Sequence, residues 1–266
     1  MSTDLELDRG GADWTVLGDG QGHRLALGGL GLAGFLAVWW LAAIPTPDFV
    51  LPTPTAVAET FVSELRSGAM LTAVQNSVIH WVPGAIIGTA LGVGFGVALA
   101  WSPVADDTGA PLVRLLRPVP PLALIGFAIA WFGLNHAGAA FIIAAGAFWI
   151  NFYAAYGGVE SVPPEFVEVA ESLGVHSSLG LIRKVVLPSA APQILTGIRT
   201  AVGRSWMLVI AAELISVPGV GQEIIAASNN LATDVVIAYI LVMSLFYLVV
   251  DSGFRAVQQN LLQWRA

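Results

Sequence analysis

The residue types that usually carry chemistry are scarce in this sequence, and those present are not grouped. The chain contains no cysteine, which excludes disulfides and thiolate metal sites, and neither His136 nor His176 has neighbours spaced as metal ligands. A phosphate-binding P-loop requires a lysine after a glycine-rich turn, but the single lysine, Lys184, follows Arg183 outside any such turn. The sequence also lacks paired carboxylates and a nucleophile constellation. It therefore predicts a protein that is not an enzyme and that binds no ATP through a P-loop.

Three ionisable residues, Arg199, Arg204 and Glu213, lie in an otherwise apolar stretch over residues 192–215. A charged group in such a stretch is costly and is expected to be paired or functional. In one helix, Arg199 and Glu213 share a face but lie about 21 Å apart along the axis, whereas Arg204 and Glu213 point in nearly opposite directions. Because Glu213 can neutralise neither arginine, each of the three needs a partner elsewhere.

The composition indicates where such a stretch belongs. Hydrophobic residues make up 56% of the chain and charged residues only 11%, against roughly 25% charged residues in an ordinary soluble domain. So few charges cannot solvate a globule of 266 residues, whereas a bilayer accepts apolar side chains if the backbone is satisfied within helices. At about 20 residues per span, roughly six helices fit. The fold class predicted is an all-α integral membrane protein.

Uncharged stretches and helix breakers place six spans along the chain. Residues 1–24 are polar and acidic, lack the basic start of a signal peptide, and are expected to form a disordered cytoplasmic tail. A short interfacial helix is expected over residues 55–65. A charged loop is expected after the second span, with Asp106, Asp107, Arg114 and Arg117. One transmembrane domain is expected over residues 25–266, with spans at about 25–44, 76–101, 118–134, 138–158, 192–215 and 234–254.

A glycine ladder marks the second span. Gly84, Gly88, Gly92 and Gly96 recur every four residues, which favours close packing against another helix. The alternative is that glycine and alanine are simply common in this chain.

The charge distribution bears on orientation and partners. With the amino terminus inside, ten of the 11 cations fall on or near the cytoplasmic side and only Arg66 lies outside. Both termini are therefore expected in the cytoplasm of a multi-pass plasma-membrane protein. The net charge of −7 disfavours nucleic acid as a partner. The excess of acidic residues over lysine fits either a salt-adapted source or a high-GC genome.

The longest polar connection, over residues 160–191, predicts two short amphipathic helices on the membrane surface. Ser161 is expected to cap the first helix, whose first turn tolerates proline, and Gly174 is expected to end it in a left-handed conformation. The second, capped by Ser177 or Ser178, is expected to end at Leu187, before a proline. Such a unit could lie on lipid or dock into another protein.

The same loop resembles the EAA loop of ABC importer permeases. Glu168-Val169-Ala170, then Gly174, then Val186-Leu187-Pro188 follow the family pattern, although Val169 replaces an alanine and the Gly174 to Pro188 interval is one residue longer than the pattern. Further motifs are similar to permeases of the nitrate, sulfonate and taurine group: Leu51-Pro52-Thr53-Pro54, Leu116-Arg117-Pro118-Val119-Pro120-Pro121, Trp131-Phe132-Gly133, Thr196-Gly197-Ile198-Arg199, Arg204-Ser205-Trp206 and Ala211-Ala212-Glu213.

The resemblance implies a type I importer permease with no cofactor of its own. The expected partners are two ATP-binding subunits that bind ATP and Mg, a second permease copy in a homodimer, and an external substrate-binding protein. The coupling loop is expected to seat in the ATPase through Glu168, Ala170, Gly174, Leu187 and Pro188, with Glu168 facing a basic group. The expected cargo is a small oxyanion such as nitrate, bicarbonate, a sulfonate or taurine. An importer of a vitamin precursor and an ion-gradient-driven secondary transporter are the alternatives.

The candidates for lining the solute path are polar, charged or aromatic residues of two spans. His80 is better explained as a polar residue at a helix end near the membrane surface. Glu213 is expected near the subunit interface or the outer gate. Arg204 either attracts an anion or, as the simpler interpretation, snorkels or pairs with a neighbouring helix. The path candidates are Asn76, Trp81, Arg204, Trp206 and Glu213.

Overall fold

The described part of the chain is helical, without a strand. The structure, a computed structural model, describes residues 21–214 and 217–261, so most of the predicted 1–24 tail lies outside the described residues. Its helices are α1 (Gln21–Ala43), α2 (Pro54–Ser67), α3 (Ala69–Trp101), α4 (Pro103–Leu116), η2 (Pro121–Leu124), α5 (Ile125–Phe132), α6 (His136–Glu160), α7 (Pro164–Ser172), α8 (Ser178–Leu181), η3 (Ile182–Val186), α9 (Leu187–Glu213), α10 (Val220–Asn229) and α11 (Thr233–Leu261).

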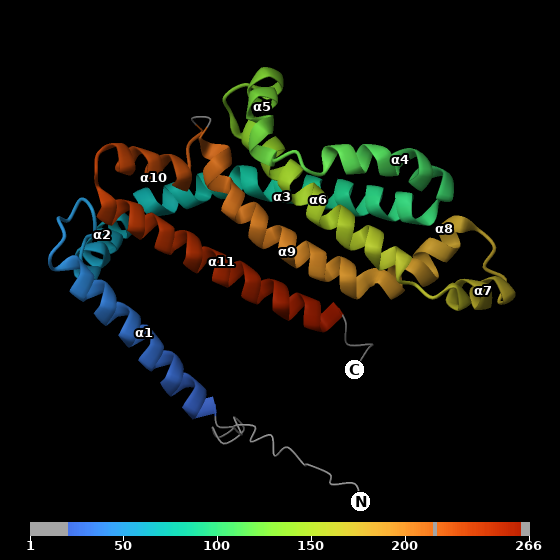
Figure 1. Ribbon diagram of the computed structural model, residues 1–266, viewed down its shortest axis with the longest axis horizontal. Coiled ribbons are helices and arrows are strands. Elements are labelled where there is room, and N and C mark those ends of the chain that lie inside the picture. The colour runs from blue at the N-terminus through green and yellow to red at the C-terminus, as the bar shows by residue number, and fades with distance from the viewer. Residues whose placement is uncertain (1–20, 215–216, 262–266) are drawn as a thin grey trace, which may run out of the picture.

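Long apolar helices dominate the architecture and confirm the predicted fold class. Within the described residues, 5 helices are long and apolar enough to cross a membrane, or up to 6 if a bent pair counts as one span. The helices α3, α6, α9 and α11 run side by side, with α7 and α8 at one end and α2 and α10 at the other (Figure 1). The helix α1 leaves this bundle and is exposed over most of its length; contacts to the rest of the chain are made near its end, by Trp39 and Ala43 (Figure 1).

The third predicted span, over residues 118–134, is a shorter helical segment, from Pro121 to Phe132. The segment after Arg117 contains the short 3-10 helix η2 and the eight-residue helix α5. The predicted charged loop before it is instead the helix α4, which Ser102 caps by accepting a hydrogen bond from the Ala105 amide. The axis of α4 and the axis of the segment formed by η2 and α5 differ by 89°. Pro118 and Pro120 lie at this bend, where proline removes backbone donors and restricts the preceding residue.

The helix α2 begins and ends as its sequence predicts. Thr53 accepts a hydrogen bond from the Ala56 amide, Pro54 occupies the first turn, and Gly68 ends the helix at φ +81°. Two long-range hydrogen bonds hold α2 against α11. Thr60 donates to Asp234 over 2.6 Å, and Tyr239 donates to Glu64 over 2.9 Å. The amphipathic helix expected at residues 55–65 is thus an integral part of the fold.

The glycine ladder of α3 packs directly against the backbone of α6, as predicted. A Cβ atom at Gly92 would lie 2.5 Å from the carbonyl oxygen of Phe148, which is closer than any real Cβ contact. The other three glycines make the same approach in a constant register: Gly84 to Ala140, Gly88 to Ala144 and Gly96 to Phe152. The helix α9 also approaches α6 closely, because a Cβ at Gly197 would overlap the Cβ of Ala154. The helices α3, α6 and α9 therefore form one closely packed unit.

Replacing Gly92 with alanine is expected to destabilise the protein by about 1–3 kcal/mol, because the added methyl group forces α3 away from α6. Gly94 lies on the same helix, and a Cβ atom there would have nothing within 4 Å. Gly94→Ala is therefore the matched control, expected to be neutral or to stabilise by up to about 1 kcal/mol. Thermal unfolding in detergent would measure both, and equal effects of the two substitutions would contradict the packing described.

Candidate functional site

The predicted coupling loop begins differently from its prediction. Ser161 does not cap α7: its hydroxyl donates to the carbonyl of Gly158 over 2.8 Å and so completes the end of α6. Pro163 occupies the N-cap position of α7 without a side-chain hydrogen bond. The first helix of the loop is therefore started by the proline pair, which fixes φ in the helical range, rather than by a serine cap.

Gly174 ends α7 in the left-handed conformation, as predicted. Its φ is +90°, a value that side-chain-bearing residues rarely adopt. The turn is closed by two backbone hydrogen bonds of 3.0 Å, from the Gly174 amide to Glu171 and from the Val175 amide to Ala170. The reversal of the chain between α7 and α8 depends on this glycine.

The second helix of the loop does not end at Leu187, as predicted, but continues into α9. Ser177 caps α8 by accepting a hydrogen bond from the Gly180 amide, but α8 then passes through the π-helical segment η3 into α9 without a break. Pro188 lies in the first turn of α9, where its missing amide costs no hydrogen bond. A π turn contains one residue more than an α turn. The segment η3 thus accommodates the residue by which this loop exceeds the family pattern.

The loop presents an apolar face that nothing in the described chain covers. Leu173, Val169 and Phe166 are 80%, 58% and 52% exposed, and only Ala170 of this face is buried. An open groove runs between α7 and the start of α9. Most of its lining is apolar, with Val162, Phe166, Val169, Leu173, Val185 and Pro188, and Ser161, Lys184 and Ser189 also line it. Of the other loop residues predicted to contact a partner, Leu187 is half-buried. A continuous apolar groove of this kind is typical of a protein interaction site.

Glu168 is exposed on α7, on the side of the helix away from the residues that line the groove. Its backbone carbonyl accepts a hydrogen bond from Ser172 over 2.9 Å. Within residues 21–214 and 217–261, no hydrogen bond or ion pair engages its carboxylate. The only cations of the loop, Arg183 and Lys184, are exposed as well. The carboxylate is therefore free to meet a basic group of another protein.

At the opposite end of the bundle, Glu213 has its partners within the chain. Its carboxyl group accepts hydrogen bonds from Ser77 over 2.5 Å and from the Gly221 amide, and it lies 2.8 Å from Nε2 of His80. Both Glu213 and His80 have side chains that are 0% exposed. His80 in turn lies 3.0 Å from His136, so one polar cluster joins α3, α6, α9 and α10.

This cluster corrects one prediction from the sequence: His80 is a buried residue within α3, not a polar residue at an exposed helix end. Glu213 is enclosed by residues of its own chain, and its placement near the subunit interface or the outer gate stays a prediction. The partners were not predictable because His80 and Glu213 are 133 residues apart in the sequence. Gly219 shows how tightly the site is built, since a Cβ there would overlap the Glu213 carboxylate.

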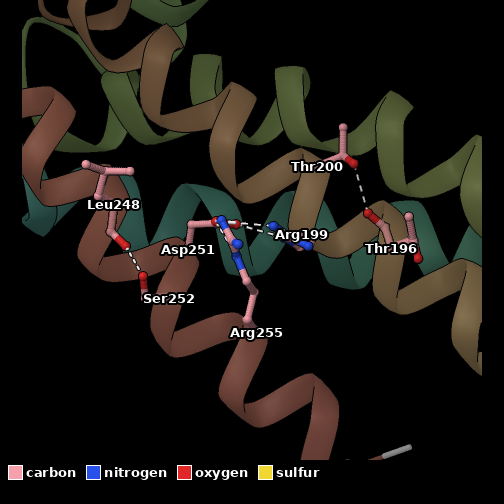
Figure 2. Close-up of polar contacts among 7 residues, drawn as sticks. All are labelled: Thr196, Arg199, Thr200, Leu248, Asp251, Ser252 and Arg255. Carbon is pink, nitrogen blue, oxygen red and sulfur yellow. Dashed lines mark hydrogen bonds and ion pairs between the residues drawn. The ribbon is translucent and has the colours of Figure 1, made fainter. Parts of the chain in front are cut away.

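Arg199 is paired with a residue that the sequence alone did not identify. Asp251 of α11, only 5% exposed, accepts hydrogen bonds from Arg199 over 2.7 Å and from Arg255 over 2.8 Å (Figure 2). One carboxylate thus holds two guanidinium groups between α9 and α11. The signal that could have revealed it is the acidic residue near the end of the sixth span.

The remaining path candidates divide between core and surface. Trp81 and Trp206 are 7% and 3% exposed, and their ring centroids lie 5.2 Å apart, so the structure places both in the packed core rather than on an open face. Their indole N–H groups donate to Ser205 and to the Met243 carbonyl, which removes the cost of burying them. Asn76 is half-buried in a groove beside α10. Arg204 is exposed on α9.

The described residues contain no group of three or more His, Cys, Asp or Glu side chains that could hold a metal ion.

Glu213→Leu is expected to destabilise the protein by roughly 3–5 kcal/mol, because it leaves buried donors of Ser77 and Gly221 without an acceptor. Glu223→Leu provides the control, since Glu223 lies exposed on the neighbouring helix α10. That change is expected to stay within about 0.5 kcal/mol. Unfolding of both variants by SDS titration measures the difference, and a Glu213 variant as stable as the control would contradict the structural role of the cluster.

Comparison with known proteins identifies the family. Residues 88–263 match the family described as "Binding-protein-dependent transport system inner membrane component". The chain is 33% identical to the taurine transport system permease protein TauC of Escherichia coli, over 88% of this chain and 87% of that protein. It is 34% identical to a putative aliphatic sulfonates transport permease protein, SsuC of Bacillus subtilis, over 81% of this chain and 78% of that protein.

A solved structure shows the same fold. An inward-facing crystal form of the MetNI methionine ABC transporter superposes with a TM-score of 0.60 at 17% identity, over 73% of this chain and 98% of that chain. The family match covers the second half of α3, all helices from α4 to α11 and the loop described above. This chain belongs to the family of inner membrane components of binding-protein-dependent transport systems, as a permease subunit of an ABC importer.

Proposed function

We propose that the loop formed by α7 and α8 is the surface through which a separate ATPase drives this permease. The observation that carries the proposal is the exposed apolar groove of α7, whose most exposed member, Leu173, is 80% exposed. Such a groove in water is unfavourable unless a partner covers it. ATP and Mg are bound by the partner, because the only lysine of this chain lies outside any P-loop.

Glu168 supplies the polar part of this contact. Its exposed carboxylate lies on the side of α7 away from the groove, where it can form a charge-assisted hydrogen bond with a basic group of an ATPase that surrounds the helix. Ala170 and Gly174 contribute differently: Ala170 packs inward, and Gly174 sets the direction in which α8 leaves. Leu187 and Pro188 carry the loop into α9.

The loop is connected to the membrane part at both of its ends. The helix α6 enters it and α9 leaves it, and these two helices pack against each other through Gly197 and Ala154. The helix α3 is fixed to α6 by the glycine ladder. A displacement of the loop by the ATPase therefore moves α3, α6 and α9 as one body and produces alternating access.

The proposed assembly contains two copies of this permease, two ATPase subunits and an external binding protein. The loop of α7 and α8, with Arg183 and Lys184, lies on the cytoplasmic side, and both termini lie on that side. The number of helices supports pairing, since 5 to 6 spans are too few to enclose a solute path in one chain.

The proposed cargo is a small oxyanion. The relatives named for taurine and for aliphatic sulfonates support this class, and nitrate and bicarbonate share its size and charge. Reconstitution of the permease with its ATPase and binding protein in proteoliposomes provides the test, with labelled taurine and nitrate as probes. Uptake is expected to require ATP and to persist when ionophores collapse ion gradients. Uptake that needs an ion gradient but no ATP would overturn the proposal.

Glu168→Arg is expected to abolish co-purification of the ATPase and to lower uptake by at least roughly tenfold, because it places like charges in contact at the docking surface. Glu160→Arg makes the same charge change at the exposed end of α6, outside the groove, and serves as the control. The control is expected to retain the ATPase. If Glu168→Arg retained both the ATPase and uptake, the docking role of this residue would be wrong.

A further inference from the structure

A polar stripe runs along one exposed side of α9. Gln193, Thr196, Thr200 and Arg204 are all exposed. In an α-helix these positions fall within about 80° of the circumference and extend over about 17 Å. The neighbouring positions behave differently: Ile194, Gly197, Ala201 and Ser205 are buried against the rest of the bundle. The stripe is therefore a distinct face of a helix that crosses the membrane.

Lipid is an unsuitable environment for this face. The helix from Ser178 to Glu213 is apolar enough overall to span a membrane, but a guanidinium in hydrocarbon is costly, and such residues normally face a partner or a water-filled cavity. Exposed apolar residues that suit lipid are plentiful elsewhere, as along α1. The polar face of α9 is therefore suited to a partner or to a water-filled path rather than to lipid.

The two arginines of α9 differ in how their charge is balanced. Arg199 donates two hydrogen bonds to Asp251, which also accepts from Arg255 (Figure 2). Arg204 forms no hydrogen bond or ion pair with any residue that the structure describes. Its positive charge is therefore available to a ligand, while Arg199 is committed to the contact between α9 and α11.

The hydroxyl groups of the stripe do not add further donors. Thr196 donates to the carbonyl of Pro192 over 2.8 Å, and Thr200 donates to the carbonyl of Thr196 over 2.9 Å (Figure 2). A single exposed guanidinium without a carboxylate partner attracts an anion but does not surround it with several hydrogen-bond donors, so binding is weak. Weak binding of this kind suits a solute in transit, which must leave the site as readily as it enters.

We propose that Arg204 is a binding residue for the transported oxyanion and that the Gln193 to Arg204 face of α9 lines its path. The inference rests on the proposed function, because it assigns a residue to the cargo of that importer. In a symmetric pair of permeases, two such faces would meet around one path and place two guanidinium groups beside it. A monovalent oxyanion group between them compensates one of the two positive charges, whereas an uncharged or cationic solute compensates neither.

Arg204→Gln and Arg204→Lys in the complete importer test the assignment, with labelled taurine and nitrate as probes. Arg204→Gln is expected to lower uptake by roughly tenfold or more, because a charge-assisted contact is lost. ATP hydrolysis stimulated by the binding protein should stay within about twofold of the unmodified importer, since docking is untouched. Arg204→Lys is expected to recover part of the uptake. Full uptake by Arg204→Gln would overturn the proposal.

A second pair of variants tests the same face without altering the arginine. Thr200→Glu places a carboxylate one turn before Arg204, where it can neutralise the guanidinium, and Thr200→Gln places an uncharged group of the same size there. Uptake is expected to be lower with Thr200→Glu than with Thr200→Gln, which reproduces the change in size without the negative charge. Equal uptake by the two variants would contradict a role in anion passage. The same holds if size-exclusion chromatography shows that the fall in uptake is fully accounted for by a smaller amount of assembled complex.

The two proposals fail in distinguishable ways. If the unmodified importer takes up neither taurine nor nitrate with ATP, the proposed cargo class is wrong, and the role of Arg204 falls with it. If the unmodified importer transports either anion and Arg204→Gln transports it equally well, only the assignment of Arg204 is wrong.

Discussion

The close approach of α3 to α6 is the contact on which the rest of this structure depends. Carbonyl oxygens of α6 occupy the space that side chains would fill at Gly84, Gly88, Gly92 and Gly96. Because lipid provides no hydrophobic force between helices, such backbone contact is a main source of cohesion in a membrane. The helix α9 joins this pair through Gly197, and the three helices connect the α7–α8 loop to the polar cluster around Glu213.

The ionisable groups of the bundle then separate into structural and functional ones. Glu213 is enclosed by Ser77, His80 and the Gly221 amide, and Asp251 is held by two arginines. Both sites connect elements that are far apart in the sequence, so their charges stabilise the fold. Glu168 and Arg204 lack such partners in the described chain and lie on exposed faces. These two residues are therefore the ones assigned to an external partner and to the cargo.

Local features could be predicted from the sequence, whereas contacts between distant segments could not. The glycine repeat and the left-handed Gly174 follow from spacing and residue type, and both were confirmed. The helical part of the third span, Pro121–Phe132, is shorter than predicted, because the chain bends by 89° between α4 and this segment, where Pro118 and Pro120 lie. The burial of His80 and the pairing of Arg199 were missed because their partners, Glu213 and Asp251, lie 133 and 52 residues away.

The central claim is that α3, α6 and α9 carry motion from the α7–α8 loop to the far end of the membrane as one body. Because the chain has no cysteine, spin labels can be attached at Glu160→Cys, at the loop end of α6 and outside the docking groove, and at Glu223→Cys beside the Glu213 cluster. The labelled chain is diluted with unlabelled copies in the complete importer, so that most labelled complexes contain one labelled chain. Double electron–electron resonance then measures the distance between its two labels with and without ATP. A rigid body predicts an unchanged distance between the two labels. A change of about 5 Å, one helical turn, would show that the helices slide past one another and would contradict the account.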